Sequence, residues 1–378
     1  MKYKDILTIP SSITHLTFDF YFNQDISELP PFLTHLTFGH NFNQNISKLP
    51  SSVTNLTFGY YFNKDVFNLP HGLTHLTFGL NFNQNVSKLP PNITCLTFGN
   101  NFNQDVSNLP PNITCLTFGN DFNQDVSNLP QGITHLTFGS EFNQDVSNLP
   151  PFLTHLIFND NFNQDVSKLP QNIINLEFGH YFNQEVISLP PTLNHLSFGH
   201  SFNQDISKLP LSLTHLILND NFNQDISNLP YSLTHLELNC DYEHDLSKLP
   251  RSLTHLTLSL KFEKYYNLSN IEYLKLDSNN LHIINSLPNS IVELELGPNF
   301  NLELNNLPTS IKKLKFDKYN YGYEHELNCL PDFVEELQLN RTYNKRILVI
   351  PQNLKKLICH EYYSYKDDFR MCSIEIYH

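Results

Sequence analysis

Apolar residues recur along this chain with a fixed spacing of twenty. Written in rows of twenty, residues 11–250 form twelve rows without an insertion or a deletion. Row positions 3, 6, 8, 12, 16 and 19 are apolar in nearly every row, and in residues 131–150 they are Ile133, Leu136, Phe138, Phe142, Val146 and Leu149. Self-similarity at such a period predicts a repeat architecture in which each row buries its apolar face against its neighbours.

Row positions 5 to 8 predict a β-strand in every row. Positions 6 and 8 are apolar and alternate with positions 5 and 7, which is the period of a half-buried strand. The prolines, such as Pro150, and the short period leave no room for a helix in the remainder of the row. We therefore expect a return path of extended segments and tight turns. Gly or Asn at position 9 (Gly99, Gly119, Asn159) suits the corner where the strand ends.

The rows predict one elongated domain instead of several globular ones. Its fold would be a leucine-rich-repeat-like solenoid, with a parallel β-sheet on the concave face, extended segments and turns on the convex face, and little helix. Residues 1–10 read as a partial first repeat, residues 11–270 as thirteen regular repeats, and residues 271–359 as five divergent ones. Residues 360–378 read as a C-terminal cap, in which Ser373–Tyr377 could form a last strand.

The second half of each regular row carries a distinctive signature. Residues 271–281 match the LxxLxLxxNxL core of a leucine-rich repeat, whereas the regular rows continue from LxxLxF into GxxFNQ. Phe102-Asn103-Gln104-Asp105-Val106 followed by Leu109-Pro110 is typical, and the Phe-Asn pair occurs in eleven successive rows from Phe22-Asn23 to Phe222-Asn223. These rows resemble FNIP repeats, a leucine-rich-repeat variant found mainly in social amoebae and in giant viruses of amoebae.

The resemblance has two departures and one implication. Many FNIP repeats have 22 residues, whereas these rows have 20. Family members often carry an N-terminal F-box that docks a ubiquitin-ligase scaffold, and this chain starts directly in a repeat, so we expect no F-box in it. The link of F-box family members to ubiquitin ligases leaves one alternative function open. The chain could be a substrate-recognition subunit in ubiquitination that joins the ligase through another protein.

The net charge and the lack of targeting signals limit the classes of partner and the cellular location that we expect. The formal net charge is −14, from 23 basic and 37 acidic residues. Nucleic acids and anionic membranes require clustered Lys and Arg, so we expect neither as a partner. The N-terminus lacks an apolar segment of signal-peptide length, and no run approaches 18 apolar residues. We expect a cytoplasmic protein, in the host cytoplasm if the source is viral, with its 6 cysteines reduced.

Row position 5 is His in most rows, and in-register strands would stack these side chains about 5 Å apart. The stack could be a polar ladder or a pH-responsive recognition surface. His75, Cys95, Cys115 and His135 also raise the possibility of zinc. Tetrahedral zinc needs four donors within about 2.0–2.3 Å of one point, and a straight ladder spreads the outer two too far apart. We therefore expect no metal and no cofactor.

Row position 7 is Thr in most rows and becomes variable from residue 157 onwards. If the concave face binds a partner, specificity should lie there. The candidate partner-binding residues on this ladder are His135, His155, His195, His215, His235, His255, Thr137, Ile157, Glu177, Ser197, Ile217 and Glu237.

Row positions 12, 13 and 15 have structural explanations. Uniform Phe and Asn predict a stacked ring spine beside a buried amide ladder, as at Phe102, Asn103, Phe122, Asn123, Phe142 and Asn143. The acidic residues at position 15 fit turn capping and solubility, because no substrate pocket or partner base accompanies them. No phosphate-binding loop, nucleophile elbow or metalloprotease motif occurs, so we expect no catalytic residues and no enzyme.

The sequence therefore favours a non-enzymatic scaffold that binds another protein on the concave face. A large face without a deep pocket suits a macromolecule better than a metabolite. The alternatives are the ubiquitination role and a structural component that self-associates through its N-terminal sheet edge, because free edges pair with other chains.

Overall fold

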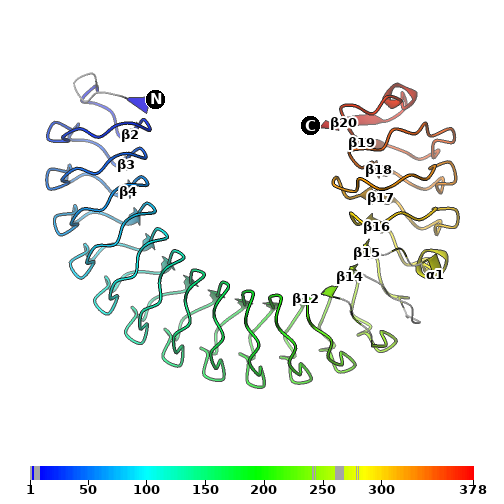
Figure 1. The fold of residues 1–378 in the computed structure, drawn as a ribbon, viewed down its shortest axis with the longest axis horizontal. Helices are drawn as coiled ribbons and strands as arrows, with labels where there is room; N and C mark the ends of the chain where they lie inside the picture. Colours follow the sequence, from blue (N-terminus) through cyan, green and yellow to red (C-terminus); the bar gives the residue numbers. More distant parts are fainter. Residues whose placement is uncertain are drawn as a thin grey trace. The chain divides into compact units, whose positions relative to one another are not determined.

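The computed structural model describes residues 2–3, 9–240, 242, 244–259, 268–277, 279 and 281–378. The chain divides into two compact units, Met1–Gly199 and His200–His378. Each unit is a stack of rows in which one short strand per row joins a parallel sheet (Figure 1). Ile6, which the sequence places in the partial first repeat, lies outside the described residues.

The strands of the first unit follow one another at intervals of about one row. Neighbouring strands pair in parallel, and from β2 onwards the register offset is twenty residues, as in Leu136 with Leu156. The strands are β1 (Lys2–Tyr3), β2 (His15–Phe18), β3 (His35–Thr37), β4 (Asn55–Thr57), β5 (His75–Thr77), β6 (Cys95–Thr97), β7 (Cys115–Thr117), β8 (His135–Thr137), β9 (His155–Ile157), β10 (Asn175–Glu177) and β11 (His195–Ser197).

The strands of the second unit are longer on average and pair in the same parallel manner. They are β12 (His215–Asp220), β13 (His235–Cys240), β14 (His255–Ser259), β15 (Tyr273–Asp277), β16 (Glu293–Leu296), β17 (Lys313–Phe316), β18 (Glu336–Gln338), β19 (Lys356–His360) and β20 (Ser373–Tyr377). The described helices are α1 (Leu281–Asn285) and the 3-10 helix η2 (Lys366–Asp368). Neither is long and apolar enough to cross a membrane. The predicted parallel solenoid with little helix is confirmed.

Two phenylalanines per row form the aromatic part of the core in the first unit. Phe98 and Phe102 stack within one row with ring centroids 3.7 Å apart, and Phe102 lies 6.1 Å from Phe122 in the next row. Phe102 is completely buried. The spacing between rows is too wide for full ring contact, so each ring packs most closely against its partner in the same row.

Glycine at row position 9 is required by the close approach of neighbouring rows. No glycine among the described residues has a positive φ, so the left-handed conformation is not the reason for its use. A Cβ placed on Gly119 would lie 2.2 Å from the carbonyl oxygen of Gly99. The backbones of successive rows therefore pack directly against each other at this corner.

Asparagine at row position 13 joins each row to the next. The Asn103 Oδ1 accepts hydrogen bonds from the backbone N–H of Asn123, at 3.0 Å, and from the Gln124 Nε2, at 2.8 Å. The same pair of bonds links Asn123 to the following row. The predicted amide ladder is thus present, but it is half-exposed instead of buried, because these amides reach along the stack towards the next row.

Aspartate at row position 15 closes the turn that follows it. The Asp105 carboxylate accepts hydrogen bonds from the backbone N–H and the Oγ of Ser107, both at 2.9 Å. Asp145, Asp165 and Asp205 repeat this arrangement. Hydrogen bonds from the serine two residues later lower the pKa of these carboxyl groups.

Acid should therefore destabilise the fold through these turns. The folded pKa values lie below the unfolded value of about 3.9, so their contribution is complete above that pH and is lost as pH falls through the folded values. We expect the urea midpoint to drop less between pH 5 and pH 3 in a variant with Asp105→Asn, Asp145→Asn and Asp165→Asn. Asn45 shows that Asn keeps the backbone bond, to Ser47, at 2.7 Å. An equal drop in both proteins would contradict this account.

Candidate interaction surface

One face of each sheet is buried and the other is open. On β8 the central Leu136 is 1% exposed, whereas His135 and Thr137 lie on the opposite side of the strand. We call the surface formed by row positions 5 and 7 the open face. It carries all the predicted partner-binding residues, which are His135, His155, His195, Thr137, Ile157, Glu177 and Ser197 in the first unit and His215, His235, His255, Ile217 and Glu237 in the second.

Register brings the variable residues of each unit together. In the first unit Glu177 lies between Ile157 and Ser197 on adjacent strands. In the second unit Ile217 lies beside Glu237. Each unit therefore places an apolar side chain next to a carboxylate on its open face. In the first unit this pair follows seven rows that have only threonine at row position 7.

The histidines stack as flat pairs. The rings of His135 and His155 lie 4.2 Å apart at an angle of 10°. In the second unit His215, His235 and His255 form a continuous stack with 4.0 Å between neighbours. Parallel imidazoles at this distance exclude water from their faces and leave their edges on the open face.

The threonine that precedes each stacked histidine fixes its ring, a role that the hydrophobic pattern of the rows does not indicate. The Thr154 hydroxyl lies 3.1 Å from the carbonyl oxygen of Thr134 and 2.9 Å from the His155 Nδ1. The hydroxyl has one proton and donates it in the hydrogen bond to the carbonyl oxygen. The His155 Nδ1 must therefore be the donor in the second contact. The recurrent Thr-His-Leu triplet was the available sequence signal.

The stack makes charging of His155 unfavourable. Its pKa is lowered, first because burial disfavours the imidazolium and then because His135 would add a second positive charge beside it. A lowered folded pKa means that the stability from this group is complete above the unfolded value of about 6.5 and declines as pH falls below it.

Replacement of His135 by Asn should raise the pKa of His155 part of the way towards 6.5. The rise is partial because burial, the larger cause, remains. Asn is already present at this row position in Asn55 and Asn175, so the strand should form normally. An NMR titration of the His155 ring protons measures the shift. An unchanged or lower pKa would show that the neighbouring imidazole has no effect.

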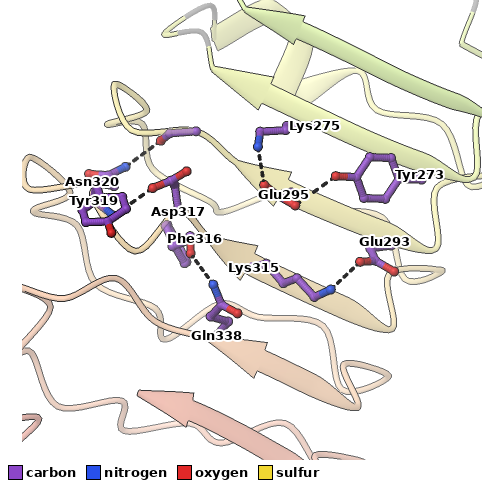
Figure 2. A network of polar contacts seen from close by, with 11 residues as sticks. Tyr273, Lys275, Glu293, Glu295, Lys315, Phe316, Asp317, Tyr319, Asn320 and Gln338 are labelled. Carbon is purple, nitrogen blue, oxygen red and sulfur yellow. Dashed lines mark hydrogen bonds and ion pairs between the residues drawn. The ribbon is translucent and has the colours of Figure 1, made fainter. Parts of the chain in front are cut away.

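The open face has a different character from β15 to β17, where charges neutralise one another. Figure 2 shows that the Lys275 Nζ and the Tyr273 hydroxyl both contact Glu295, at 2.6 Å and 2.9 Å. The Lys315 Nζ lies 2.6 Å from Glu293 in the same view. Acidic and basic strands alternate here, so each carboxylate meets an ammonium group on one of the two neighbouring strands.

Ion pairing dominates the electrostatics of this region. Burial alone would raise the pKa of Glu293, but hydrogen bonds from Lys315 and Lys313 outweigh it and lower the pKa. These pairs are partly exposed, so each stabilises the fold little.

The surface beside the variable residues of the first unit is shallow among the residues that the structure describes. A hollow of about 550 Å³ borders the first unit's open face and is wide open to solvent, with a lining of Phe152, Thr154, Asn172, Ile174, Thr192 and Asn194. The four residues considered for zinc, His75, Cys95, Cys115 and His135, lie on four successive strands. Within the described parts of the chain, no three His, Cys, Asp or Glu side chains converge as a metal site.

Comparisons with known proteins agree on the fold. The family model for the FNIP repeat matches residues 22–61, 47–81, 82–121, 105–140, 166–201, 202–241 and 323–362. CroV588, a circular leucine-rich-repeat protein of a giant virus, is 34% identical with a TM-score of 0.72, and the match covers 100% of this chain and 71% of that one. A search of curated protein sequences finds no match.

Two bacterial structures are more distant. The functional domain of InlJ from Listeria monocytogenes is 17% identical, with a TM-score of 0.43 over 96% of this chain and 73% of that one. YopM from Yersinia enterocolitica is 22% identical, with a TM-score of 0.40 over 92% of this chain and 66% of that one. Neither likeness is close enough to carry an argument. The extent of the repeat matches and the identity to CroV588 show that the chain belongs to the FNIP repeat family of leucine-rich-repeat-like solenoids.

Proposed function

We propose that this chain is a non-enzymatic protein–protein interaction scaffold whose partner binds the open face, which we infer to be the concave side of the stack. Repeat solenoids related to leucine-rich-repeat proteins are generally interaction scaffolds. The observation that carries the proposal is the in-register open face itself, where half-exposed side chains repeat from strand to strand beside an open hollow. A broad surface of this kind fits a protein better than a small molecule.

The proposal assigns specificity to the variable residues. Ile157 and Glu177 follow directly after seven successive threonines at row position 7, from Thr17 to Thr137. The apolar side chain can be buried against a partner, and the carboxylate beside it can pair with a basic group of that partner. Interface hot spots combine buried apolar contacts with charge complementarity in this way. The stacked imidazoles of His135 and His155 flank this pair and supply a rigid aromatic surface.

A pair of matched variants tests the surface. The first carries Ile157→Lys and Glu177→Lys on the open face. The second carries Ile187→Lys and Glu185→Lys, which make the same chemical change at exposed positions outside the sheet. Each variant and the unchanged chain are used as bait in lysate of the native host cell. Thermal melts establish that all three are folded.

We expect the proteins retained by the unchanged chain to be lost from the first variant and kept by the second. Interfaces lose much of their affinity when a central contact becomes repulsive, so the loss should be at least about tenfold. Retention by both variants, or loss only from the second, would contradict the proposal. Ligase subunits among the retained proteins would favour the ubiquitination role.

A further inference from the structure

Cys95 and Cys115 interrupt the histidine ladder at one place in the first unit. They lie on β6 and β7 as direct register partners, and the same open face carries both side chains. Both thiols are free and half-buried. Burial raises the pKa of the Cys115 thiol, and the proximity of Cys95 raises it further. The two sulfur atoms are therefore close enough to influence each other without being joined.

Strand geometry distinguishes two ways in which these sulfurs could be connected. Adjacent strands lie about 4.8 Å apart, and in-register side chains leave them in parallel. A relaxed disulfide requires Cβ atoms about 3.8 Å apart, so the bond would have to draw the strands together. An ion held linearly between two thiolates keeps the sulfurs apart by two metal–sulfur bonds, far more than the S–S bond of about 2.05 Å in a disulfide. Strands at their normal spacing therefore suit the second arrangement better.

The neighbouring histidine rings are each fixed by their own strand. The His75 Nδ1 contacts the Thr74 hydroxyl at 2.9 Å, and the His135 Nδ1 contacts the Thr134 hydroxyl at 2.9 Å. Each hydroxyl donates its proton to a backbone carbonyl oxygen of the preceding row, at 3.1 Å in both cases. The Nδ1 atoms are thus engaged within their own strands, and the two sulfurs are the donors that the register of β6 and β7 brings directly together.

We propose that Cys95 and Cys115 bind one Cu(I) ion as a linear two-thiolate bridge between β6 and β7. Thiolates are the donors that select soft ions such as Cu(I). Binding releases the two thiol protons and places the ion across adjacent rows, where it links them in the manner of a staple. Zinc is disfavoured at the same pair because it requires four donors. The site is separate from the proposed partner contact at Ile157 and Glu177.

Competition with a chromophoric Cu(I) chelator under anaerobic conditions tests the site. The proteins compared are the unchanged chain, Cys95→Ser, Cys115→Ser and Cys329→Ser, the last being a control for an exposed cysteine elsewhere. We expect each of the first two variants to lose one Cu(I) equivalent, with affinity at that site at least about 100-fold lower. We expect the control to keep that equivalent.

X-ray absorption on the one-equivalent complex provides an independent readout. The expected signal is two sulfur neighbours and no nitrogen neighbour. Full binding by Cys95→Ser or Cys115→Ser would overturn the proposal, as would a copper shell that includes imidazole nitrogen. Rapid formation of a Cys95–Cys115 disulfide by a mild oxidant, without loss of thermal stability, would show that the strands adapt to the shorter distance and would also count against it.

Discussion

Replacement of Phe102 by Ala should lower the free energy of unfolding by about 3–5 kcal/mol. Its ring is completely buried, stacks on Phe98 at 3.7 Å, and lies between Phe82 and Phe122 of the neighbouring rows at 6.1 Å. The rows are fixed by backbone pairing on both sides, so they cannot collapse into the space that the ring leaves. The cost should therefore include a full cavity term.

Urea denaturation followed by far-UV circular dichroism measures this change. Phe67→Ala is the matched control, because Phe67 is 42% exposed and lies outside the core. We expect the control to shift the unfolding free energy by less than about 1 kcal/mol. A similar loss in both variants would show that aromatic burial in the row interior is not what holds the stack together.

Replacement of Gly119 by Ala should destabilise the fold by about 1–3 kcal/mol through overpacking. The added methyl would overlap the backbone carbonyl oxygen of Gly99, which lies in the preceding row. Backbone atoms cannot rotate away as the end of a side chain can, so the two rows must separate locally.

Gly132→Ala is the corresponding control within the adjoining row. A Cβ there would lie 3.7 Å from the carbonyl oxygen of Ile113, which is an ordinary van der Waals contact. We expect this substitution to be neutral or to stabilise by up to about 1 kcal/mol, because alanine restricts the unfolded chain. Equal destabilisation in both variants would point to glycine flexibility instead of row-to-row contact.

The strands and the core were predictable because one rule repeats. Each row shows the same alternation around its central leucine, so every row supports the same prediction. The pattern places Leu136 and Phe142 in the interior, and both are buried. Pairing by whole rows follows from the absence of insertions, since any other register would misalign the apolar positions.

Features that depend on contacts between rows were less predictable. The role of Gly119 lies in the distance to a carbonyl oxygen twenty residues earlier. The orientation of His155 depends on the Thr154 hydroxyl, which donates a hydrogen bond to the carbonyl oxygen of Thr134 in the preceding row. The pairing of Lys275 with Glu295 depends on side-chain conformations as well as register. Sequence patterns identify which residues share a face and do not determine the bonds between them.

The proposed function leads to a distinction between two parts of the open face. Around Ile157 and Glu177 the residue types depart from the repeat, whereas around Glu293 and Lys315 the charges are already paired. A partner gains more from the first region because less existing bonding must be displaced.

Hydroxyl-radical footprinting of the chain alone and in complex with its captured partner tests the central claim most directly. This method reports side-chain exposure, whereas the amides of these strands are already hydrogen-bonded within the sheet. The account predicts that oxidation of His155 and Ile157 falls at least about threefold on binding, in line with burial at an interface core, while oxidation of Ile187 is unchanged. Protection of Ile187 with His155 and Ile157 unaffected would place the partner away from the open face and contradict the account.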